Sequence, residues 1–367
     1  MSDPISSKLQ LDTILKLPNF TLKTKCNINL DEVTGLFGPS GSGKSTLLRI
    51  ISGIEKRSTG NIIYKNSVWQ NSKKIVPAYL RPVGYVFQNS YLFDHLNVEG
   101  NLRYAEFRRL DKNTKGITFD MVVSAFDLKS LLNRDILSVS GGEKQRIAIA
   151  RTLLSNPSLL LLDEPLTALD IKHKKEIFPY LKSLYKTFGI PMIYVSHSIK
   201  EMGELTDRMI VIENGKIKTI GLTHEVLSKS GLDYFVDNLS PVSMLKVKVS
   251  RILPQFNLTE VLHKDQKIMI PGIDEKTLGS YIRIIIRASD VVLSLKKPEN
   301  LSVRNIIHGK VENIKDFKES PFAFVSIDIG ESSIISMVTN QAISDLGIEV
   351  GLNIYALIKT TIFNDEF

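Results

Sequence analysis

The chain has few of the features that cross-link a protein or insert it into a membrane. Cys26 is its only cysteine, so no disulfide can form within the chain, and we expect a reducing compartment. No apolar run approaches the roughly 20 residues that a membrane-spanning helix needs. The first ten residues, MSDPISSKLQ, lack the basic and then apolar segments of a secretion signal. Any attachment to a membrane should therefore depend on a partner protein.

The bulk composition is that of a folded protein with more than one domain. Of the 367 residues, 43% are hydrophobic and 23% are charged, which excludes a disordered chain. A chain of this length favours two or three domains. The formal charge of +8 suits an anionic partner such as a nucleic acid, a phospholipid surface or a nucleotide. Because the basic residues are dispersed, the charge by itself favours an ordinary solvated surface.

Two patterns divide the chain. In residues 1–235, apolar runs typical of strands alternate with helical patterns, and the continuously apolar PSLLLLDE, residues 157–164, is typical of a buried parallel strand. Beyond about residue 240, short β-branched runs are separated by Gly, Asn, Asp and Pro. We expect an α/β domain over 1–235, a linker and first β-barrel segment over 236–300, and a small all-β, OB-like barrel domain over 301–367.

The stretch GPSGSGKS has the spacing of a phosphate-binding loop between a strand and a helix. Glycines let backbone N–H groups turn toward a phosphate, and the start of the helix adds partial positive charge. The lysine can reach the β- and γ-phosphates of a nucleotide, and the serine after it can ligate Mg²⁺. The candidate ATP-binding residues are Gly38, Pro39, Ser40, Gly41, Ser42, Gly43, Lys44, Ser45 and Thr46.

Polar side chains at the ends of other predicted strands complete an ATPase site. Asp163 ends a buried strand and can join Ser45 and Gln88 around Mg²⁺, while Glu164 can deprotonate the attacking water. His197, after another apolar strand, can contact the γ-phosphate, and the Gln88 amide can also reach the water. The predicted catalytic residues are therefore Glu164, His197 and Gln88.

With these motifs in place, the chain resembles the ATPase subunits of ABC transporters. VSGGEKQRIAIARTLL is similar to the family's signature motif, although Val139 replaces the usual leucine. The resemblance implies a head-to-tail homodimer, in which each signature contacts the nucleotide held by the other chain. The implied contacts are Ser140, Gly141, Gly142 and Glu143, and Asp170 in LTALD is implied to stabilise the dimer. For the aromatic that stacks on adenine, Phe20 is the candidate, and a core position suits it equally well.

The stretch QNSYLFDHLNVEGNLRYA, from Gln88, resembles importer ATPases for inorganic anions and metal ions. In that family this region helps to form a groove for a helix of the membrane permease. The resemblance implies a protein at the cytoplasmic face of the membrane. Its direct partner would be a permease and its indirect partner a periplasmic or lipid-anchored substrate-binding protein, with no nucleic acid partner. Tyr91, Leu92, Phe93 and Leu96 are groove candidates, and core positions are the alternative.

The C-terminal part is similar to the molybdate-type importer ATPases. The resemblance implies a domain that binds molybdate or tungstate through hydroxyls, amides and cationic side chains. The matching residues are Ser302, Arg304, Asn305, Thr339, Lys359 and Thr360. Two interpretations of the domain stay open, namely a sensor that slows transport when cytosolic oxyanion is abundant and a purely structural element. For the whole chain, import of tungstate, sulfate or ferric iron and a soluble, non-transport ABC ATPase remain alternatives.

Overall fold

The computed structural model describes residues 8–109, 117–167, 169, 171–227, 241–273, 277–316, 320–360 and 363. The chain divides into two compact units, with the boundary between Gly221 and Leu222. The boundary predicted at residue 235 lies outside the described residues and stays a prediction. Within the described residues, no helix is both long enough and apolar enough to span a bilayer.

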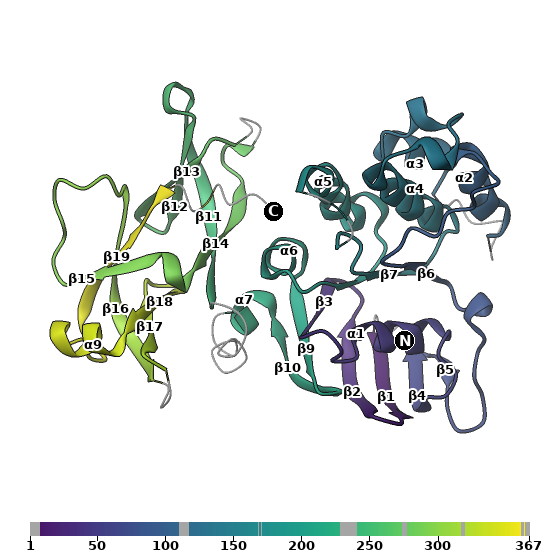
Figure 1. Ribbon diagram of the computed structural model, residues 1–367, viewed down its shortest axis with the longest axis horizontal. Coiled ribbons are helices and arrows are strands. Elements are labelled where there is room, and N and C mark those ends of the chain that lie inside the picture. The colour runs from purple at the N-terminus through teal and green to yellow at the C-terminus, as the bar shows by residue number, and fades with distance from the viewer. Residues whose placement is uncertain are drawn as a thin grey trace, which may run out of the picture. The chain divides into compact units, whose positions relative to one another are not determined.

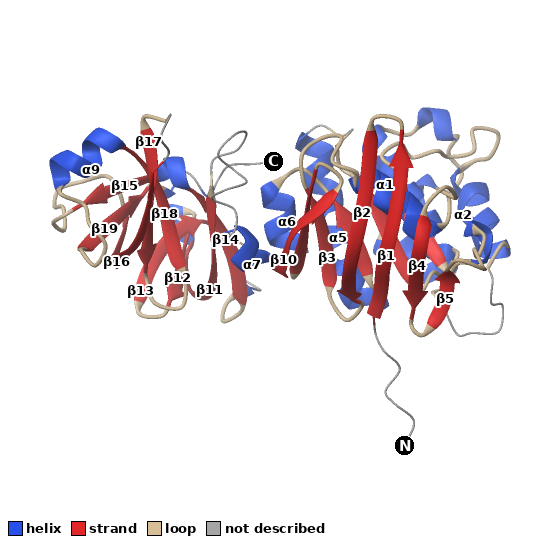
Figure 2. Cartoon of the chain, turned by 90° about the horizontal axis from the view of Figure 1, so that it is seen from below, coloured by secondary structure: helices blue, strands red, loops and turns tan. Residues whose placement is uncertain are grey.

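The first unit is built on a ten-stranded sheet in the order β5-β4-β1-β2-β10-β9-β3-β8-β7-β6. Strands β9, β3, β8, β7 and β6 run parallel, whereas β2, β1, β4 and β5 pair antiparallel and lie side by side in Figure 2. The strand bounds are β1 (Lys8–Leu17), β2 (Phe20–Asn29), β3 (Val33–Phe37), β4 (Thr59–Tyr64), β5 (Ser67–Gln70), β6 (Val83–Val86), β7 (Leu159–Asp163), β8 (Met192–Val195), β9 (Arg208–Glu213) and β10 (Lys216–Leu222). The predicted parallel α/β sheet is confirmed.

Helices of the first unit pack on this sheet and on one another. Helices α2, α3 and α4 contact each other and form one group in Figure 1, and α4 also contacts β6. The helix bounds are α1 (Lys44–Ser52), α2 (Val98–Phe107), α3 (Phe119–Ala125), α4 (Gly141–Leu154), α5 (Ile171–Phe188) and α6 (Ile199–Leu205). Helix α7 (Thr223–Glu225) follows the boundary and belongs to the second unit, where it contacts β11. Short 3-10 helices lie at η1 (Ala78–Leu80), η2 (Lys129–Leu131) and η3 (Ile136–Ser138).

Burial follows the residue pattern in these strands. Every residue of β7, LLLLD, is buried, as expected for a strand covered on both faces. In β2, buried and exposed residues alternate, because one face of the antiparallel part packs on the core and the other meets solvent. Cys26 points to the core in β2, and burial raises the pKa of its thiol to about 12. Cys26 is therefore a core residue of a strand, without the exposure that a reactive thiol needs.

The second unit consists of two antiparallel sheets that share a large apolar core, which confirms the predicted all-β fold of the C-terminal part. The bounds 301–367 stay a prediction. Four strands form the order β13-β12-β11-β14, and five form β15-β19-β16-β17-β18. The bounds are β11 (Val242–Leu253), β12 (Leu258–His263), β13 (Gln266–Pro271), β14 (Tyr281–Arg287), β15 (Val291–Ser294), β16 (Asn305–Asp316), β17 (Phe322–Asp328), β18 (Ser333–Thr339) and β19 (Asn353–Ile358), with helices η5 (Pro254–Phe256), η7 (Ala288–Asp290) and α9 (Asn340–Leu346).

Two amide side chains join the sheets of the second unit. The Asn305 amide accepts a hydrogen bond from the Met269 N–H and donates one to the Met269 carbonyl, at 2.6 and 3.0 Å. In the reverse direction, the Gln266 amide bonds both backbone groups of His308, at 2.8 and 2.9 Å. Each side-chain amide thus makes the two hydrogen bonds that the backbone of a neighbouring strand would make to a residue of the other sheet. The predicted division at residue 300 separates β15 from β16, although both pair with β19.

Candidate nucleotide-binding site

Four parallel strands of the first unit end at one edge of the sheet, and each is followed by a predicted site residue. Strand β3 leads into the phosphate loop, β7 into Glu164, β8 into His197 and β6 into Gln88. Ligands in open parallel sheets bind at this carboxyl edge. The fold therefore places residues from four distant segments along one edge.

The phosphate loop has the backbone conformation that its glycines permit. Gly38, Gly41 and Gly43 have φ values of +153°, +77° and +108°, a region that side chains disfavour. At Gly38, a Cβ would lie 2.1 Å from the Ile212 carbonyl oxygen, so no other residue fits. Ser42 adds a buried hydroxyl that has no hydrogen-bond partner among the residues the structure describes. The loop thus presents donors to an anion without side-chain obstruction.

Lys44, at the first position of α1, is almost wholly buried. Its ammonium donates to the Gly38 and Pro39 carbonyls, at 2.8 and 2.9 Å. Burial lowers the pKa of Lys44, and the charges of Glu164 and Asp163 act in the opposite direction. A phosphate would offer the ammonium a full counter-charge in place of two neutral carbonyls. An anion at the loop would therefore form stronger hydrogen bonds with Lys44 than its two carbonyl partners do.

Asp163 connects the end of β7 with α1 and β6. Its carboxylate accepts hydrogen bonds from the Ser45 hydroxyl at Oδ1 and from the Tyr85 hydroxyl at Oδ2, both at 2.7 Å. Ser45 and Asp163, predicted to share a metal ion, are thus in direct contact. Sequence reasoning missed Tyr85. The available signal was a tyrosine in an apolar strand, because a buried phenol needs a hydrogen-bond partner.

Glu164 lies immediately after the strand in a strained backbone conformation. Its φ is +47°, which costs on the order of 1–3 kcal/mol for a residue with a Cβ. The carboxylate accepts a hydrogen bond from the Thr167 hydroxyl at 3.1 Å and lies 3.6 Å from His197 Nδ1. The structure therefore brings the two predicted catalytic residues Glu164 and His197 together. Asp170 lies outside the described residues.

A buried carboxylate fixes the turn that carries His197. Glu201, in α6, accepts hydrogen bonds from the Tyr194 and Ser196 hydroxyls at 2.7 and 2.6 Å. The Ser198 hydroxyl caps α6 by accepting from the Glu201 N–H. Sequence reasoning missed this network, because it depends on how α6 folds back onto β8. The network thus fixes Ser196 and Ser198, the residues before and after His197 in the sequence.

Gln88 is exposed, beyond the end of β6, and the structure does not bring it to Asp163 or Glu164 through any hydrogen bond among the described residues. Two residues further on, the Ser90 hydroxyl donates to the Gln145 side chain at 2.8 Å. Gln145 is buried in α4, the helix of the signature motif. The segment after β6 is thus joined to the signature helix within one chain.

The signature motif forms a capping box at the start of α4. The Ser140 hydroxyl accepts from the Glu143 N–H, and the Glu143 carboxylate accepts from the Ser140 N–H at 2.7 Å. A Cβ at Gly142 would lie 2.5 Å from the His173 ring, whereas one at Gly141 would meet nothing closer than 3.8 Å. Val139 is buried and packs at the helix entrance. Glycine is therefore required by packing at position 142 and not at 141.

The Glu143 carboxylate makes this helix start sensitive to acid. The backbone hydrogen bond from Ser140 is the main cause of its lowered pKa. A carboxyl with a lowered pKa stabilises the fold above its unfolded pKa of about 4.5, and this contribution is lost as the pH falls through the folded value.

We expect wild type to lose about 1 kcal/mol more stability than Glu143→Gln between pH 6 and pH 3.5, because glutamine keeps the capping hydrogen bond without titrating. Thermal unfolding of both chains at each pH measures this difference. Parallel stability profiles for the two chains would contradict it.

Residues predicted to line a permease groove are partly exposed. Tyr91 is 64% exposed, while Leu92, Phe93 and Leu96 are half-buried. Arg151 donates to the Tyr91 carbonyl at 2.8 Å and lies over the Phe93 ring. Their role in docking stays a prediction.

Phe20 lies at the phosphate loop, where its ring would be 2.9 Å from a Cβ at Gly43, and it also packs on the core. Both interpretations of Phe20 therefore stay open.

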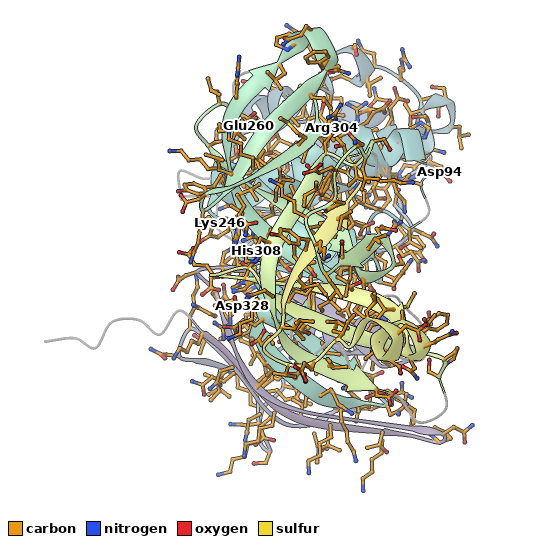
Figure 3. The ribbon with its side chains drawn as sticks, turned by 90° about the vertical axis from the view of Figure 1, so that its left-hand side faces the viewer. Asp94, Lys246, Glu260, Arg304, His308 and Asp328 are labelled. Atoms are coloured by element: carbon orange, nitrogen blue, oxygen red, sulfur yellow. The ribbon has the colours of Figure 1, made fainter. Side chains whose placement is uncertain are left out.

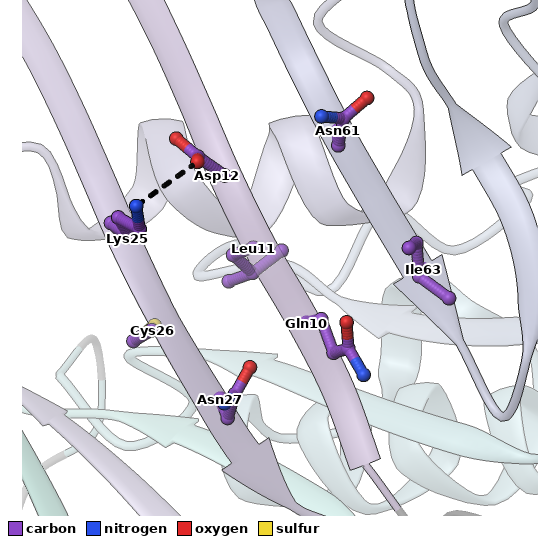
Figure 4. Close-up of a pocket in the computed structure, with 8 residues that line it drawn as sticks. All are labelled: Gln10, Leu11, Asp12, Lys25, Cys26, Asn27, Asn61 and Ile63. Carbon is purple, nitrogen blue, oxygen red and sulfur yellow. Dashed lines mark ion pairs between the residues drawn. The ribbon is translucent and has the colours of Figure 1, made fainter.

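A separate hollow of about 400 Å³ lies on the antiparallel strands, lined by Gln10, Asn27 and Asn61 and by the Lys25–Asp12 ion pair (Figure 4). It contains no residue of the phosphate loop.

The predicted oxyanion residues are spread over the second unit. Thr339 caps α9 and pairs with Phe322 at the other end of the sheet from Asn305. Both amide atoms of Asn305 already bond Met269, and Thr360 lies 3.5 Å from the Asn305 nitrogen. The other three candidates, Ser302, Arg304 and Lys359, are exposed. Arg304 is labelled in Figure 3. The structure thus brings only Asn305 and Thr360 into contact.

The parallel sheet, the phosphate loop before α1 and the carboxylates at the end of β7 define a phosphate-loop ATPase. A family model for ABC transporters matches residues 22–167, and one for the TOBE domain matches residues 301–361. Because curated members are 38% identical over 96% of this chain, the chain belongs to the family of ABC-transporter ATP-binding subunits.

Two relatives and one solved structure illustrate this membership. The Molybdenum import ATP-binding protein ModC of Escherichia coli strain K12 is 38% identical over 96% of this chain and 98% of its own. The protein of the same name from Shigella flexneri gives the same figures. The structure of cbiO1 from Clostridium perfringens, part of the ABC transporter complex cbiONQ, is 27% identical, with a TM-score of 0.51, and covers 64% of this chain and 95% of its own.

Proposed function

We propose that this chain is the ATP-hydrolysing subunit of a molybdate importer. The observation that carries the proposal is the similarity to relatives named Molybdenum import ATP-binding protein, which extends over both units of the chain. The alternative cargoes, tungstate, sulfate and ferric iron, have no comparable support among the relatives reported. We place the chain at the cytoplasmic face of the membrane, bound to its permease.

The phosphate loop binds ATP through backbone N–H groups and Lys44. The candidate contacts are Gly38, Pro39, Ser40, Gly41, Ser42, Gly43, Lys44, Ser45 and Thr46. Exchange of two carbonyl partners for phosphate oxygens strengthens the hydrogen bonds of Lys44, because both partners are then charged. The unpartnered hydroxyl of Ser42 gains an acceptor in the same step.

The residues at the end of β7 fit Mg²⁺, which prefers oxygen ligands from a hydroxyl, one or two carboxylates and the substrate phosphates. Ser45 and Asp163 supply such oxygens 2.7 Å apart, and Gln88 would add an amide oxygen. When bound, the metal neutralises charge on the phosphates.

Glu164 is placed to accept a proton from the water that attacks the γ-phosphate. The hydroxyl of Thr167 donates to Oε2 of this carboxylate, and His197 Nδ1 lies 3.6 Å from the same oxygen. The His197 imidazole can then donate to a γ-phosphate oxygen. The hydrogen bonds of Glu201 keep the histidine turn in place during this step.

We propose that two copies act head to tail. Ser140, Gly141, Gly142 and Glu143 begin a helix, and the N-terminus of a helix of this length attracts anions. Asp170 would support the facing phosphate loop. The Ser90–Gln145 hydrogen bond lets a permease contact near Gln88 move the signature helix, which couples closure of the dimer to transport.

The second unit is proposed to bind oxyanion at Thr360, Lys359 and the neighbouring Ser302 and Arg304, and so to slow transport. Titration of the full-length chain with molybdate should show saturable binding that sulfate does not displace. Lys359→Ala should weaken binding, since it removes the cationic side chain, whereas Lys267→Ala in β13 is the matched control. Absence of saturable binding would leave the domain a structural element.

Molybdate uptake by living cells tests the transport function itself. A strain without its own importer ATPase, but with the permease and binding protein, should regain uptake from micromolar molybdate when it expresses this chain. The Lys44→Ala chain should not restore uptake, because it lacks the ammonium at the phosphate loop. Restored uptake with that variant would contradict ATP-driven import.

A further inference from the structure

Tyr85 occupies an unusual place for a strand residue in the first unit. It belongs to β6, at the edge of the sheet next to β7, and its ring lies 4.3 Å from that of Phe87. Its hydroxyl reaches across to Asp163 Oδ2 at 2.7 Å. The hydroxyl is the donor in this hydrogen bond, because a carboxylate oxygen can only accept.

The Asp163 carboxylate has one donor on each oxygen. Ser45 occupies Oδ1 and Tyr85 occupies Oδ2, so the two bonds fix both the position and the plane of the group. At 6% exposure, Asp163 has little access to water that could replace a lost donor. Removal of either hydroxyl would leave a buried carboxylate oxygen without a partner.

Lys44 is a cation that could compete for Asp163. The charge of Asp163 already acts on the Lys44 ammonium, yet that ammonium bonds the carbonyls of Gly38 and Pro39 and no carboxylate. A direct Lys44–Asp163 pair would draw the lysine from the phosphates and the aspartate from Ser45. Such a pair would compete with the binding of both nucleotide and metal. The site therefore needs Lys44 and Asp163 to stay apart.

We propose that Tyr85 is a positioning residue of the metal site, which holds Asp163 toward Ser45 and away from Lys44. The inference rests on the proposed binding of ATP with Mg²⁺ at this edge of the sheet. Ser45 can give its lone pairs to a metal only while its proton is donated to Asp163. Tyr85 thus acts on the metal through Asp163 and needs no contact with the metal itself.

The test is Tyr85→Phe in the full-length chain, which removes the hydroxyl and keeps the ring beside Phe87. Tyr64→Phe is the matched control, since Tyr64 stacks on Trp69 at 4.4 Å and donates to the Ser158 carbonyl at 2.7 Å, outside the site. A fluorescent ATP analogue measures affinity by anisotropy, once with Mg²⁺ and once with EDTA. Thermal unfolding confirms that each variant folds.

With Mg²⁺, we expect Tyr85→Phe to bind the analogue about tenfold more weakly than wild type does. In EDTA, its affinity should fall much less. Tyr64→Phe should keep the wild-type ratio between the two affinities. An equal loss in both buffers, or an unchanged ratio in Tyr85→Phe, would overturn the positioning role. If wild type itself gained no affinity from Mg²⁺, the proposed metal site would be wrong instead.

Discussion

Replacement of Glu164 by glutamine is expected to reduce ATP turnover by about 10²- to 10⁴-fold, the usual contribution of a general base. The amide can still accept the Thr167 hydrogen bond, so the loop should keep its conformation. It cannot accept the proton of the attacking water at neutral pH. ATP binding should persist, and the ATP-bound dimer should accumulate.

Steady-state hydrolysis and size-exclusion chromatography with ATP measure the two effects of Glu164→Gln. Glu204→Gln is the matched control, because Glu204 makes an ion pair with Lys182 at 3.4 Å in the same unit and lies away from the phosphate loop. Loss of such a pair costs about 0–1 kcal/mol of stability. Wild-type turnover in Glu164→Gln would show that another group accepts the proton.

Replacement of Gly141 by aspartate should reduce hydrolysis by about 10²-fold or more, through a negative charge where the signature meets a phosphate. The structure makes this position a cleaner probe than Gly142. A Cβ at Gly141 has room, whereas one at Gly142 would collide with His173. An aspartate in the first turn of α4 also suits the helix dipole, so the fold should survive.

Gly141→Ala is the control for added bulk and should retain hydrolysis within a few-fold of wild type. Nucleotide binding to the isolated chain should be normal in both variants, because Lys44 lies in another segment. A mixture of Gly141→Asp and Lys44→Ala chains should regain activity, since a head-to-tail mixed dimer keeps one intact site. Mixed dimers with no more activity than the separate variants would contradict shared sites.

The parts of the site that sequence predicted best are those in which local geometry and chemistry coincide. The phosphate loop needs glycines at positive φ, and three of its glycines have it. Asp163 and Glu164 stand at the end of an apolar run typical of a buried strand, and parallel pairing then brings them to the same edge as His197. Such features require no knowledge of side-chain packing.

Two of the contacts that sequence missed join elements far apart in the chain. Tyr85 meets Asp163 across 78 positions, and only the alignment of β6 with β7 makes that contact possible. Asn305 matched a resemblance to anion-binding domains, yet its amide pairs with Met269 in another sheet. An amide looks the same in sequence whether it binds a ligand or a backbone, so its partner emerges only from the fold.

The central claim is that ATP hydrolysis by this chain drives molybdate import. The most direct measurement is the ATPase rate of the chain with its permease in proteoliposomes, with the binding protein empty or loaded with molybdate, tungstate or sulfate. We expect the molybdate-loaded binding protein to stimulate hydrolysis, the sulfate-loaded protein not to do so, and Glu164→Gln to abolish the stimulation. Equal rates with empty and molybdate-loaded binding protein would contradict it.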